Sequence, residues 1–301
     1  MSNGNQTVTE SRISVVIPGY NAERYIDALG AAFAAQTRAA HEVLFIDDGS
    51  TDRTAERAAE YFHVVRMLQN KGPAAARNCG IETATGDVIA FTDCDCRPEP
   101  DWIEWIERRF CEPDMQVLMG AIQMLPSGWF GDSVSALGFP AGGSLGFERV
   151  WRVAEDGRTD HISSCNFAAR AAVFTEHGAF DTDFRRTYGE DAELSFRLTR
   201  AGVPIVFCPE LLVRHPALAS GPAFVRNQIA RGRGNCRFKR KVGPVRTFVR
   251  LRLWSSANIV RAYCRDPKFP LILCLLALSF CLQQWGYVLE RSRKSEVGSR
   301  K

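Results

Sequence analysis

Residues 87–95 read DVIAFTDCD, an apolar run that ends in two carboxylates one residue apart. The apolar part predicts a short buried strand. Open α/β sheets bind ligands beyond the carboxyl ends of their strands, which is where Asp93 and Asp95 lie. Residues i and i+2 of an extended chain point the same way, so both carboxylates can face one ligand. Because neighbouring carboxylates repel, a hard divalent cation held with diphosphate oxygens is a natural partner. A solvated acidic loop is the alternative.

The residues around this strand alternate strand and helix signals. Strands are expected at 13–17, 43–47 and 64–68, and helices at 22–35, 50–62, 73–84, 102–110, from about 170, and at 190–201. Repeated β-α-β units with short connections predict an α/β fold with a mostly parallel, Rossmann-like sheet flanked by helices. Between residues 125 and 160 glycines and aromatics interrupt the pattern. This interruption predicts a mobile lobe or acceptor loop outside the core.

The charge of the chain is small overall but unevenly distributed. The net charge is +4 over 301 residues, yet thirteen Lys and Arg lie between residues 226 and 268 against one acid, Asp266. Such asymmetry predicts an anionic partner. Apolar residues spaced among the cations favour an anionic membrane surface. Nucleic acid is not expected as a partner, because no recognition module surrounds these cations.

Residues 269–289 carry no charged side chain, and their number matches the thickness of a bilayer core. Trp285 and Tyr287 suit a membrane interface. Two glutamines nearby keep a buried or monotopic helix as an alternative to a spanning one. Basic flanks and a polar N-terminus without an apolar leader favour attachment to the cytoplasmic face of the cell membrane, single-pass or monotopic. Ten cysteines without a C-x-x-C pair predict free thiols and no zinc site.

Polar turns after the predicted strands are further candidate binding sites. Residues 18–23, PGYNAE, offer backbone groups and an aromatic ring to a base, or form a plain turn. Residues 47–52, DDGSTD, offer a carboxylate to a ribose or base, or cap the next helix. Residues 70–78, NKGPAAARN, place Lys71 and Arg77 at a helix start, which favours phosphate. Pairing of Arg77 with a surface acid is the alternative.

Two more carboxylates, Glu190 and Asp191, open a predicted helix, where an acid often serves only as a cap. The chain contains neither G-x-G-x-x-G nor G-x-x-x-x-G-K-[ST]. Neither a dinucleotide site nor a P-loop site is therefore expected.

Taken in order, these motifs resemble family 2 glycosyltransferases of the GT-A fold over roughly residues 11–215. The shared motifs are PGYN, DDGSTD, NKG with ARN, Asp93-x-Asp95, Asn166 and Glu190-Asp191. The resemblance implies inverting transfer from a nucleotide-diphosphate sugar, with a UDP-sugar as the expected donor. The implied acceptor is a hydroxyl of a lipid-linked or cell-envelope glycan.

The resemblance also implies a role for each matching residue. Asp191 would be the general base, and Asn166 and Glu190 would line the sugar or acceptor. Donor binding would fall to Pro18, Tyr20, Glu23, Asp48, Lys71, Arg77 and Asp93, and Mg²⁺ or Mn²⁺ binding to Asp95 and Asp93, with His215 as a further ligand or a structural residue. A carboxylate suits the base, because it can accept the hydroxyl proton late, as the bond to the sugar forms.

One departure from the family pattern concerns processivity. Processive members carry Q-x-x-R-W, whereas this chain has Gln228-Ile229-Ala230-Arg231-Gly232. The aromatic platform for a growing chain is absent, and the chain offers one candidate membrane helix where a secretion channel would need several. Both features predict addition of a single sugar.

The expected organisation is a polar tail at 1–10, a catalytic domain at 11–215 (nucleotide half 11–97, acceptor half 98–215), a basic membrane-proximal segment at 216–268, the apolar segment 269–289 and a basic tail at 290–301. A nucleotidyltransferase is a rival, but it would need a G-x-G-T-R-rich first loop. A non-catalytic membrane adaptor is a second rival, and intact Asp93, Asp95 and Asp191 argue against it.

Overall fold

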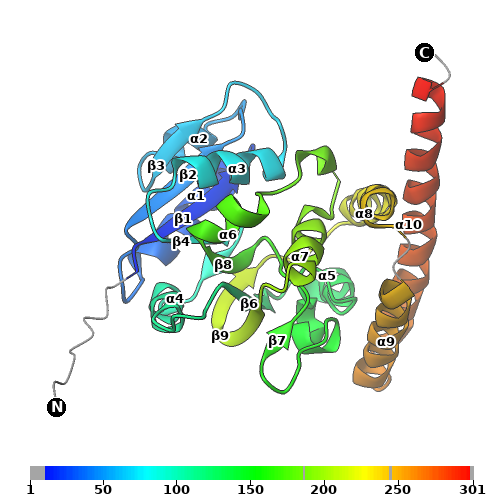
Figure 1. Ribbon diagram of the computed structural model, residues 1–301. Coiled ribbons are helices and arrows are strands. Elements are labelled where there is room, and N and C mark those ends of the chain that lie inside the picture. Colours follow the sequence, from blue (N-terminus) through cyan, green and yellow to red (C-terminus); the bar gives the residue numbers. More distant parts are fainter. Residues whose placement is uncertain (1–10, 186, 244–245, 299–301) are drawn as a thin grey trace.

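The computed structural model describes residues 11–185, 187–243 and 246–298, without the side chains of 246–249 and 294–298. Figure 1 shows a central sheet with helices on both sides and a long C-terminal helix along one flank. The expected tail at 1–10 and residues 299–301 of the basic tail lie outside the described residues. The strands are β1 Ile13–Gly19, β2 Glu42–Asp47, β3 His63–Arg66, β4 Val88–Thr92, β5 Arg97–Pro98, β6 Val117–Met124, β7 Arg158–Thr159, β8 Asn166–Arg170 and β9 Ile205–His215.

The sheet has the strand order β3-β2-β1-β4-β8-β6-β9-β5, and β7 pairs with β9. The first four strands pair in parallel, as the β-α-β pattern predicts. The second half is mixed, because β8 pairs antiparallel with both β4 and β6, whereas β6 and β9 run parallel. The fold is a mixed α/β sheet of the GT-A type.

Helices cover the two faces of the sheet. One face packs on α1 Glu23–Ala34, α2 Thr54–Ala58 and α4 Trp102–Phe110; the other packs on α3 Pro73–Thr83, α6 Ala171–His177 and α7 Glu190–Arg200. Fully buried Phe45 and Trp102 lie on the first face, and stacked Phe91 and Phe167 on the second. Apolar residues on alternate sides of each strand therefore form two separate cores.

The irregular region 125–160 is packed, which corrects the expectation of a mobile lobe outside the core. It contains α5 Gly128–Ser135 and the short 3-10 helices η1 Gly143–Leu145 and η2 Phe147–Arg149. These elements form a third apolar cluster with α8 Gly221–Val242, α9 Arg246–Tyr263 and α10 Phe269–Gly298. Val134, Leu137 and Ile272 are each at most 1% exposed in this cluster.

Strand ends bring the acidic motifs to one edge of the sheet. Asp93 and Asp95 follow β4, at the end of the parallel part. The two-residue strand β5 then pairs Arg97 with Arg214 of β9. This pairing places the end of β9, and with it His215, beside the acidic turn.

Candidate active site

Arg77 of α3 links two acidic motifs that are 97 residues apart in sequence. Its guanidinium donates to Asp93 Oδ1 at 2.6 Å and to Glu190 Oε1 at 3.2 Å. The side chain is 3% exposed and lies over the ring of Phe180. Burial alone would lower the pKa of Arg77, but the carboxylates of Asp93 and Glu190 raise it. Arg77 therefore stays charged and holds the turn after β4 against the start of α7.

This placement corrects the prediction that Arg77 and the turn before α3 face a phosphate directly. Arg77 is buried and committed to two carboxylates. The backbone N–H groups of Lys71 and Gly72 donate to the carboxylate of Asp48, at 2.7 and 2.8 Å. Asp48 is itself 3% exposed, so it anchors this turn. The Lys71 side chain, by contrast, is exposed.

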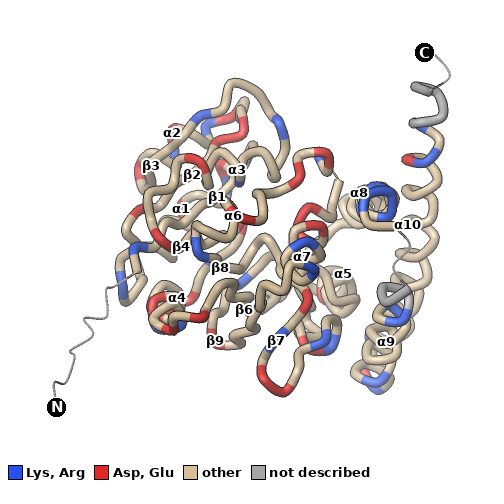
Figure 2. Tube along the Cα trace, in the orientation of Figure 1, with Lys and Arg blue, Asp and Glu red and all other residues tan. Residues whose placement is uncertain are grey.

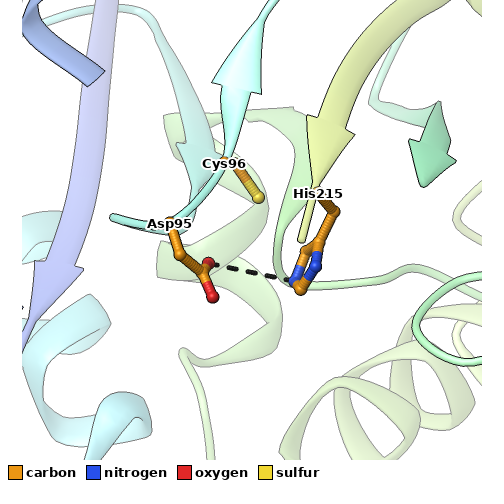
Figure 3. Close-up of side chains that lie close together, drawn as sticks. All are labelled: Asp95, Cys96 and His215. Atoms are coloured by element: carbon orange, nitrogen blue, oxygen red, sulfur yellow. Dashed lines mark ion pairs between the residues drawn. The ribbon is translucent and has the colours of Figure 1, made fainter. Parts of the chain in front are cut away.

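A second cluster lies beyond Asp93 and contains Asp95, Cys96 and His215 (Figure 3). Their candidate ligand atoms all lie within 4.8 Å of one another, and His215 Nε2 is 3.9 Å from Asp95 Oδ1. His215 Nδ1 lies 2.6 Å from the carbonyl oxygen of Pro216. Since a carbonyl only accepts, Nδ1 carries the hydrogen, and in the neutral ring the Nε2 lone pair faces Asp95.

These donors suit a hard divalent cation. Asp95 supplies oxygen and His215 an oriented nitrogen, as metal-binding histidines do when the other ring nitrogen is hydrogen-bonded. Burial raises the pKa of Cys96 well above its ordinary value. A thiol is also a soft ligand, which suits a hard cation poorly. Asp93 is two residues before Asp95, and its partly exposed side chain lies beside Arg77. It could therefore bind the same ion or accept a hydrogen bond from a donor hydroxyl.

Glu190 and Asp191 form the third part of the site, at the N-terminus of α7. Burial, and then the neighbouring charge of Asp191, raises the pKa of Glu190 to about 7. Burial also raises the pKa of Asp191, while the N–H of Ala192, which donates to Asp191 Oδ1 at 2.8 Å, opposes the shift. The Asp191 carboxylate makes no ion pair among the described side chains, which leaves its second oxygen for an acceptor proton.

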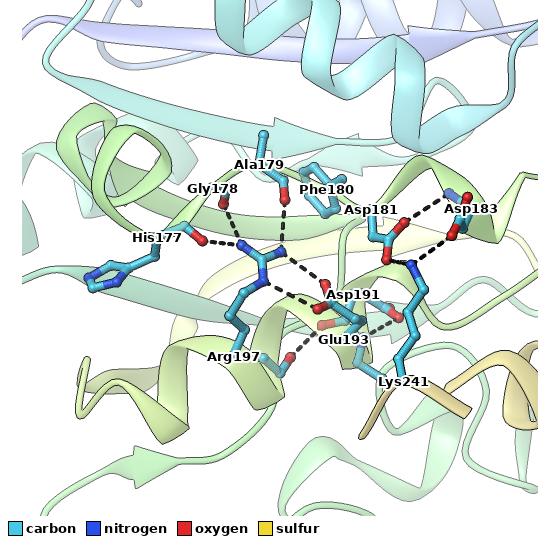
Figure 4. Close-up of polar contacts among 12 residues, drawn as sticks. His177, Gly178, Ala179, Phe180, Asp181, Asp183, Asp191, Glu193, Arg197 and Lys241 are labelled. Atoms are coloured by element: carbon cyan, nitrogen blue, oxygen red, sulfur yellow. Dashed lines mark hydrogen bonds and ion pairs between the residues drawn. The ribbon is translucent and has the colours of Figure 1, made fainter. Parts of the chain in front are cut away.

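The loop between α6 and α7 is held from two sides, as Figure 4 shows. Arg197 of α7 donates to the carbonyl oxygens of His177, Gly178 and Ala179. Lys241 of α8 pairs with Asp181 and Asp183. This loop carries Phe180, on which Arg77 lies. The contacts of Arg197 and Lys241 thus hold in place the loop against which the Arg77 side chain packs.

The remaining predicted donor residues lie in the turn after β1. Pro18 is buried within the strand, Tyr20 is 47% exposed, and Glu23 begins α1 half-buried. Asn21 ties this turn to the turn after β2, because its side-chain oxygen accepts from the Thr51 N–H and its own N–H donates to Ser50. An exposed ring above two linked turns is consistent with the predicted base platform.

Asn166 does not reach the site, contrary to the prediction that it lines the sugar or acceptor. It is completely buried. Its amide oxygen accepts from Trp102 Nε1 at 2.8 Å, and its amide nitrogen donates to the carbonyls of Ala121 and Leu211. Asn166 therefore ties β8 to β6, β9 and α4.

Arg231 of α8 is a site residue that the sequence does not assign. Its guanidinium lies 4.3 Å from the ring centre of Phe139 and 5.5 Å from that of Tyr188. Its charge lowers the pKa of Asp191 against the larger effect of burial. His161 is buried, and its pKa is lowered to about 3, mainly by burial and then by the charge of Arg231. Its ring stacks on that of Trp151. The Q-x-x-R spacing marks Arg231 in the sequence, but nothing local marks Trp151 or His161.

The glycine in Q-x-x-R-G is explained by helix packing. A Cβ on Gly232 would lie 2.0 Å from the carbonyl oxygen of Gln283 in α10, and a Cβ on Gly286 would lie 2.1 Å from that of Ile229 in α8. The two backbones approach too closely for any side chain at either position. At the position of the Trp in the processive motif, this chain has Gly232, on which α10 packs directly.

The fold and the acidic motifs at its strand ends define a GT-A glycosyltransferase. The mannosyltransferase PcManGT from Pyrobaculum calidifontis, solved with GDP-Man and Mn²⁺, has a similar fold: the TM-score is 0.61 at 16% identity, over 95% of this chain and 88% of that chain. GalNAc-T7, solved with UDP, GalNAc and Mn²⁺, gives a TM-score of 0.56 at 17% identity, over 86% and 57% of the two chains.

Sequence comparison gives the family. The chain belongs to Glycosyl transferase family 2, whose sequence model matches residues 14–177. Glycosyltransferase AglE of Haloferax volcanii is 27% identical over 76% of this chain and 74% of its own length. The pre-mycofactocin glycosyltransferase of Mycobacterium tuberculosis is 29% identical over 67% of this chain and 42% of its own. The protein is a glycosyltransferase.

Proposed function

We propose that this glycosyltransferase moves one sugar, with inversion, from a nucleotide-diphosphate sugar to a hydroxyl of a lipid-linked or cell-envelope glycan. A UDP-sugar is the preferred donor. The observation that carries the proposal is the Arg77 network, which joins Asp93 after β4 to Glu190 at the start of α7. Because Asp191 follows Glu190 directly, the network would bring a donor-side carboxylate and a proton-accepting carboxylate close to one buried cation.

The residues divide the reaction between them. Tyr20 and the linked turns would hold the base, and Lys71 would meet the diphosphate. Mg²⁺ or Mn²⁺ held by Asp95 and His215, with Asp93, would stabilise the charge on the leaving diphosphate. The oxygen of the acceptor hydroxyl would bond to the anomeric carbon as the bond from that carbon to the diphosphate breaks. Asp191 would accept the proton that this hydroxyl loses. One proton-accepting carboxylate on the acceptor side suffices for inversion, because no separate nucleophile is needed.

We also propose that the enzyme adds a single sugar, that its domains have the bounds given below, and that it acts at the membrane. The Gly232 contact with α10 supports single-sugar addition, because no aromatic platform can stand there. Residues 11–215 are proposed as the catalytic domain, with 216–268 and 269–289 packed onto it through the third apolar cluster. The catalytic domain is placed at the cytoplasmic face of the membrane.

A donor assay tests the proposal. Purified protein is incubated with labelled nucleotide sugars, membranes and Mn²⁺, with and without a chelator. We expect release of UDP that the chelator abolishes. In a parallel incubation with a sugar phosphate and a nucleoside triphosphate, release of pyrophosphate would instead identify a nucleotidyltransferase. No turnover with any donor would favour the non-catalytic adaptor.

A further inference from the structure

Helix α10 has one face against the protein along its apolar length. Its buried residues recur every three or four positions: Ile272, Leu275, Leu276, Ser279, Gly286 and Glu290. That spacing marks a single helical face. Among the described residues, α10 is the one helix long and apolar enough to cross a membrane, yet only 28% of its apolar window is buried.

The opposite face of α10 is apolar and uncovered. It carries Leu273 (39% exposed), Leu278 (43%), Phe280 (37%), Trp285 (64%), Val288 (57%) and Leu289 (38%). A helix on the surface of a water-soluble protein normally turns polar residues outward. A continuous exposed apolar face of this kind marks an interaction surface.

Charged side chains of other elements contact α10 or the residue before it from one end to the other. Lys268 pairs with Asp132 at 2.9 Å just before the helix, and Arg252 lies 4.9 Å from the ring centre of Phe280 near its middle. Toward the far end, Arg237 donates to Glu290 at 2.7 Å. From residue 268 to 290 the helix extends about 33 Å, the thickness of a bilayer core. A spanning α10 would place these two ion pairs at the two interfaces, but it would carry Arg252, which lies beside the middle of the helix, into hydrocarbon.

The exposed charges on α8, α9 and α10 are mostly positive and favour an anionic partner. Exposed cations on α8, α9 and α10 and the turns between them include Arg226, Lys239, Arg250, Arg261, Arg265, Arg291 and Arg293, as Figure 2 shows for these helices. Among described side chains from 221 to 293, the only acids are Asp266, which accepts from the Lys268 N–H, and Glu290, which is buried against Arg237. Two copies joined through this face would bring like charges together, whereas anionic lipid complements them.

We propose that α10 lies in the plane of an anionic membrane, with its outer face among the acyl chains near the headgroups and the catalytic domain in water. This inference deepens the proposed function and, for the acceptor, rests on it. Helix α8 lies between α10 and the site, since Gly232 abuts the Gln283 carbonyl and Gly234 abuts that of Tyr188. Tyr188, three residues before Asp191, is thus separated from the membrane helix by α8 alone. The acceptor hydroxyl is accordingly one carried close to a lipid headgroup.

Depth measurement tests the orientation without any assay of activity. The exposed thiols Cys274 and Cys281 are seven residues apart, which is roughly 10 Å along a helix axis. Each is labelled singly with an environment-sensitive fluorophore in the full chain, with the other exposed cysteines, including Cys111 and Cys264, changed to Ser. Quenching by lipids brominated at defined depths is measured in phosphatidylglycerol/phosphatidylcholine vesicles. We expect equal, shallow depths; a difference of roughly 10 Å would mean a spanning helix and overturn the proposal.

A charge-insertion variant tests the surface itself. Leu278→Glu with Leu289→Glu should lower binding to the same vesicles by at least about tenfold, because each exposed leucine then carries a charge into the interface. Leu68→Glu is the matched control, since Leu68 is fully exposed on the loop before α3 and should leave binding unchanged. Unchanged binding of the double variant would refute the proposal. So would a vesicle-free dimer of the wild type that fails to bind lipid and that the double variant converts to a monomer.

Discussion

Glu190 is the site carboxyl whose protonation changes near neutral pH. Its pKa is raised from 4.5 to about 7, first by burial and then by Asp191. Between these values the folded protein binds the proton more tightly than the unfolded chain. Glu190 therefore stabilises the fold fully below pH 4.5, and this contribution is lost as the pH rises through about 7.

We expect the free energy of unfolding of the wild type to fall relative to Glu190→Gln as the pH rises through this window. The difference should reach as much as about 3 kcal/mol, because each pKa unit corresponds to roughly 1.4 kcal/mol. Urea unfolding at several pH values measures it, with Glu56→Gln, an exposed change on α2, as the control. Parallel curves for wild type and Glu190→Gln would show that Glu190 is not held protonated.

Arg231 and Asp191 give a second pH prediction, on catalysis. Asp191 must be ionised to accept a proton, so the rate should rise as the pH rises through its pKa. Because the charge of Arg231 lowers that pKa, Arg231→Gln should move the acidic limb of kcat to higher pH. Arg231→Lys should restore the limb, and Arg226→Gln, an exposed change on the same helix, should leave it in place. An unmoved limb in Arg231→Gln would remove Arg231 from the site.

At the scale of residues, the sequence predicts which side chains lie at the site better than it predicts what those side chains contact. Asp48, Arg77 and Glu190 are all present at the site edge, but their partners are buried groups far along the chain. Arg77 of α3 bonds Glu190 of α7 on the same face of the sheet, and Asp48 holds the backbone of Lys71 and Gly72. A spacing pattern cannot show whether a charged side chain faces a ligand or a second charge. Asn166 illustrates this, because the same motif position serves three interior hydrogen bonds.

At the scale of elements, the contact of α8 with α10 makes its own prediction. Gly232→Trp, which restores the motif of processive relatives, should drive the indole into the Gln283 carbonyl. We expect a loss of stability of about 3 kcal/mol or more, since overpacking of this kind displaces backbone. Gly221→Trp at the start of the same helix has open space around it and should be nearly neutral. Thermal unfolding compares the two, and an equally stable Gly232→Trp would contradict the packing.

Elements with local signals were predictable, and those defined by distant partners were not. Helix α4 lies at 102–110 as expected, and α1 and α3 agree with their predicted bounds to within a residue. Helix α2 is shorter, ending at Ala58. Strands β6 and β9 were not anticipated, because neither stands in a regular β-α-β unit and β8 inserts antiparallel beside β6. The third apolar cluster was missed because its partners lie more than 100 residues away in α9 and α10.

At the scale of the whole molecule, α10 is both a part of the fold and the proposed contact with lipid. Deletion of residues 269–301 would expose Val134, Leu137 and Ile259 of the third cluster. We therefore expect the truncated chain to aggregate or unfold, not to be released as a folded soluble domain. The exposed-face variant Leu278→Glu with Leu289→Glu should keep the wild-type melting temperature. A truncated chain that unfolds cooperatively near the wild-type temperature would show that α10 is a mere appendage.

The central claim is that Asp191 takes the acceptor proton within a site organised by Arg77. The most direct test is the rate of sugar transfer by Asp191→Asn, measured together with its affinity for the donor and Mn²⁺ by calorimetry. The asparagine keeps the bond from the Ala192 N–H but cannot accept the proton. We expect kcat to fall about a thousandfold with donor affinity nearly unchanged, whereas Asp114→Asn, the same change at an exposed position, keeps full activity. Transfer by Asp191→Asn at a rate close to that of the wild type would contradict the central claim.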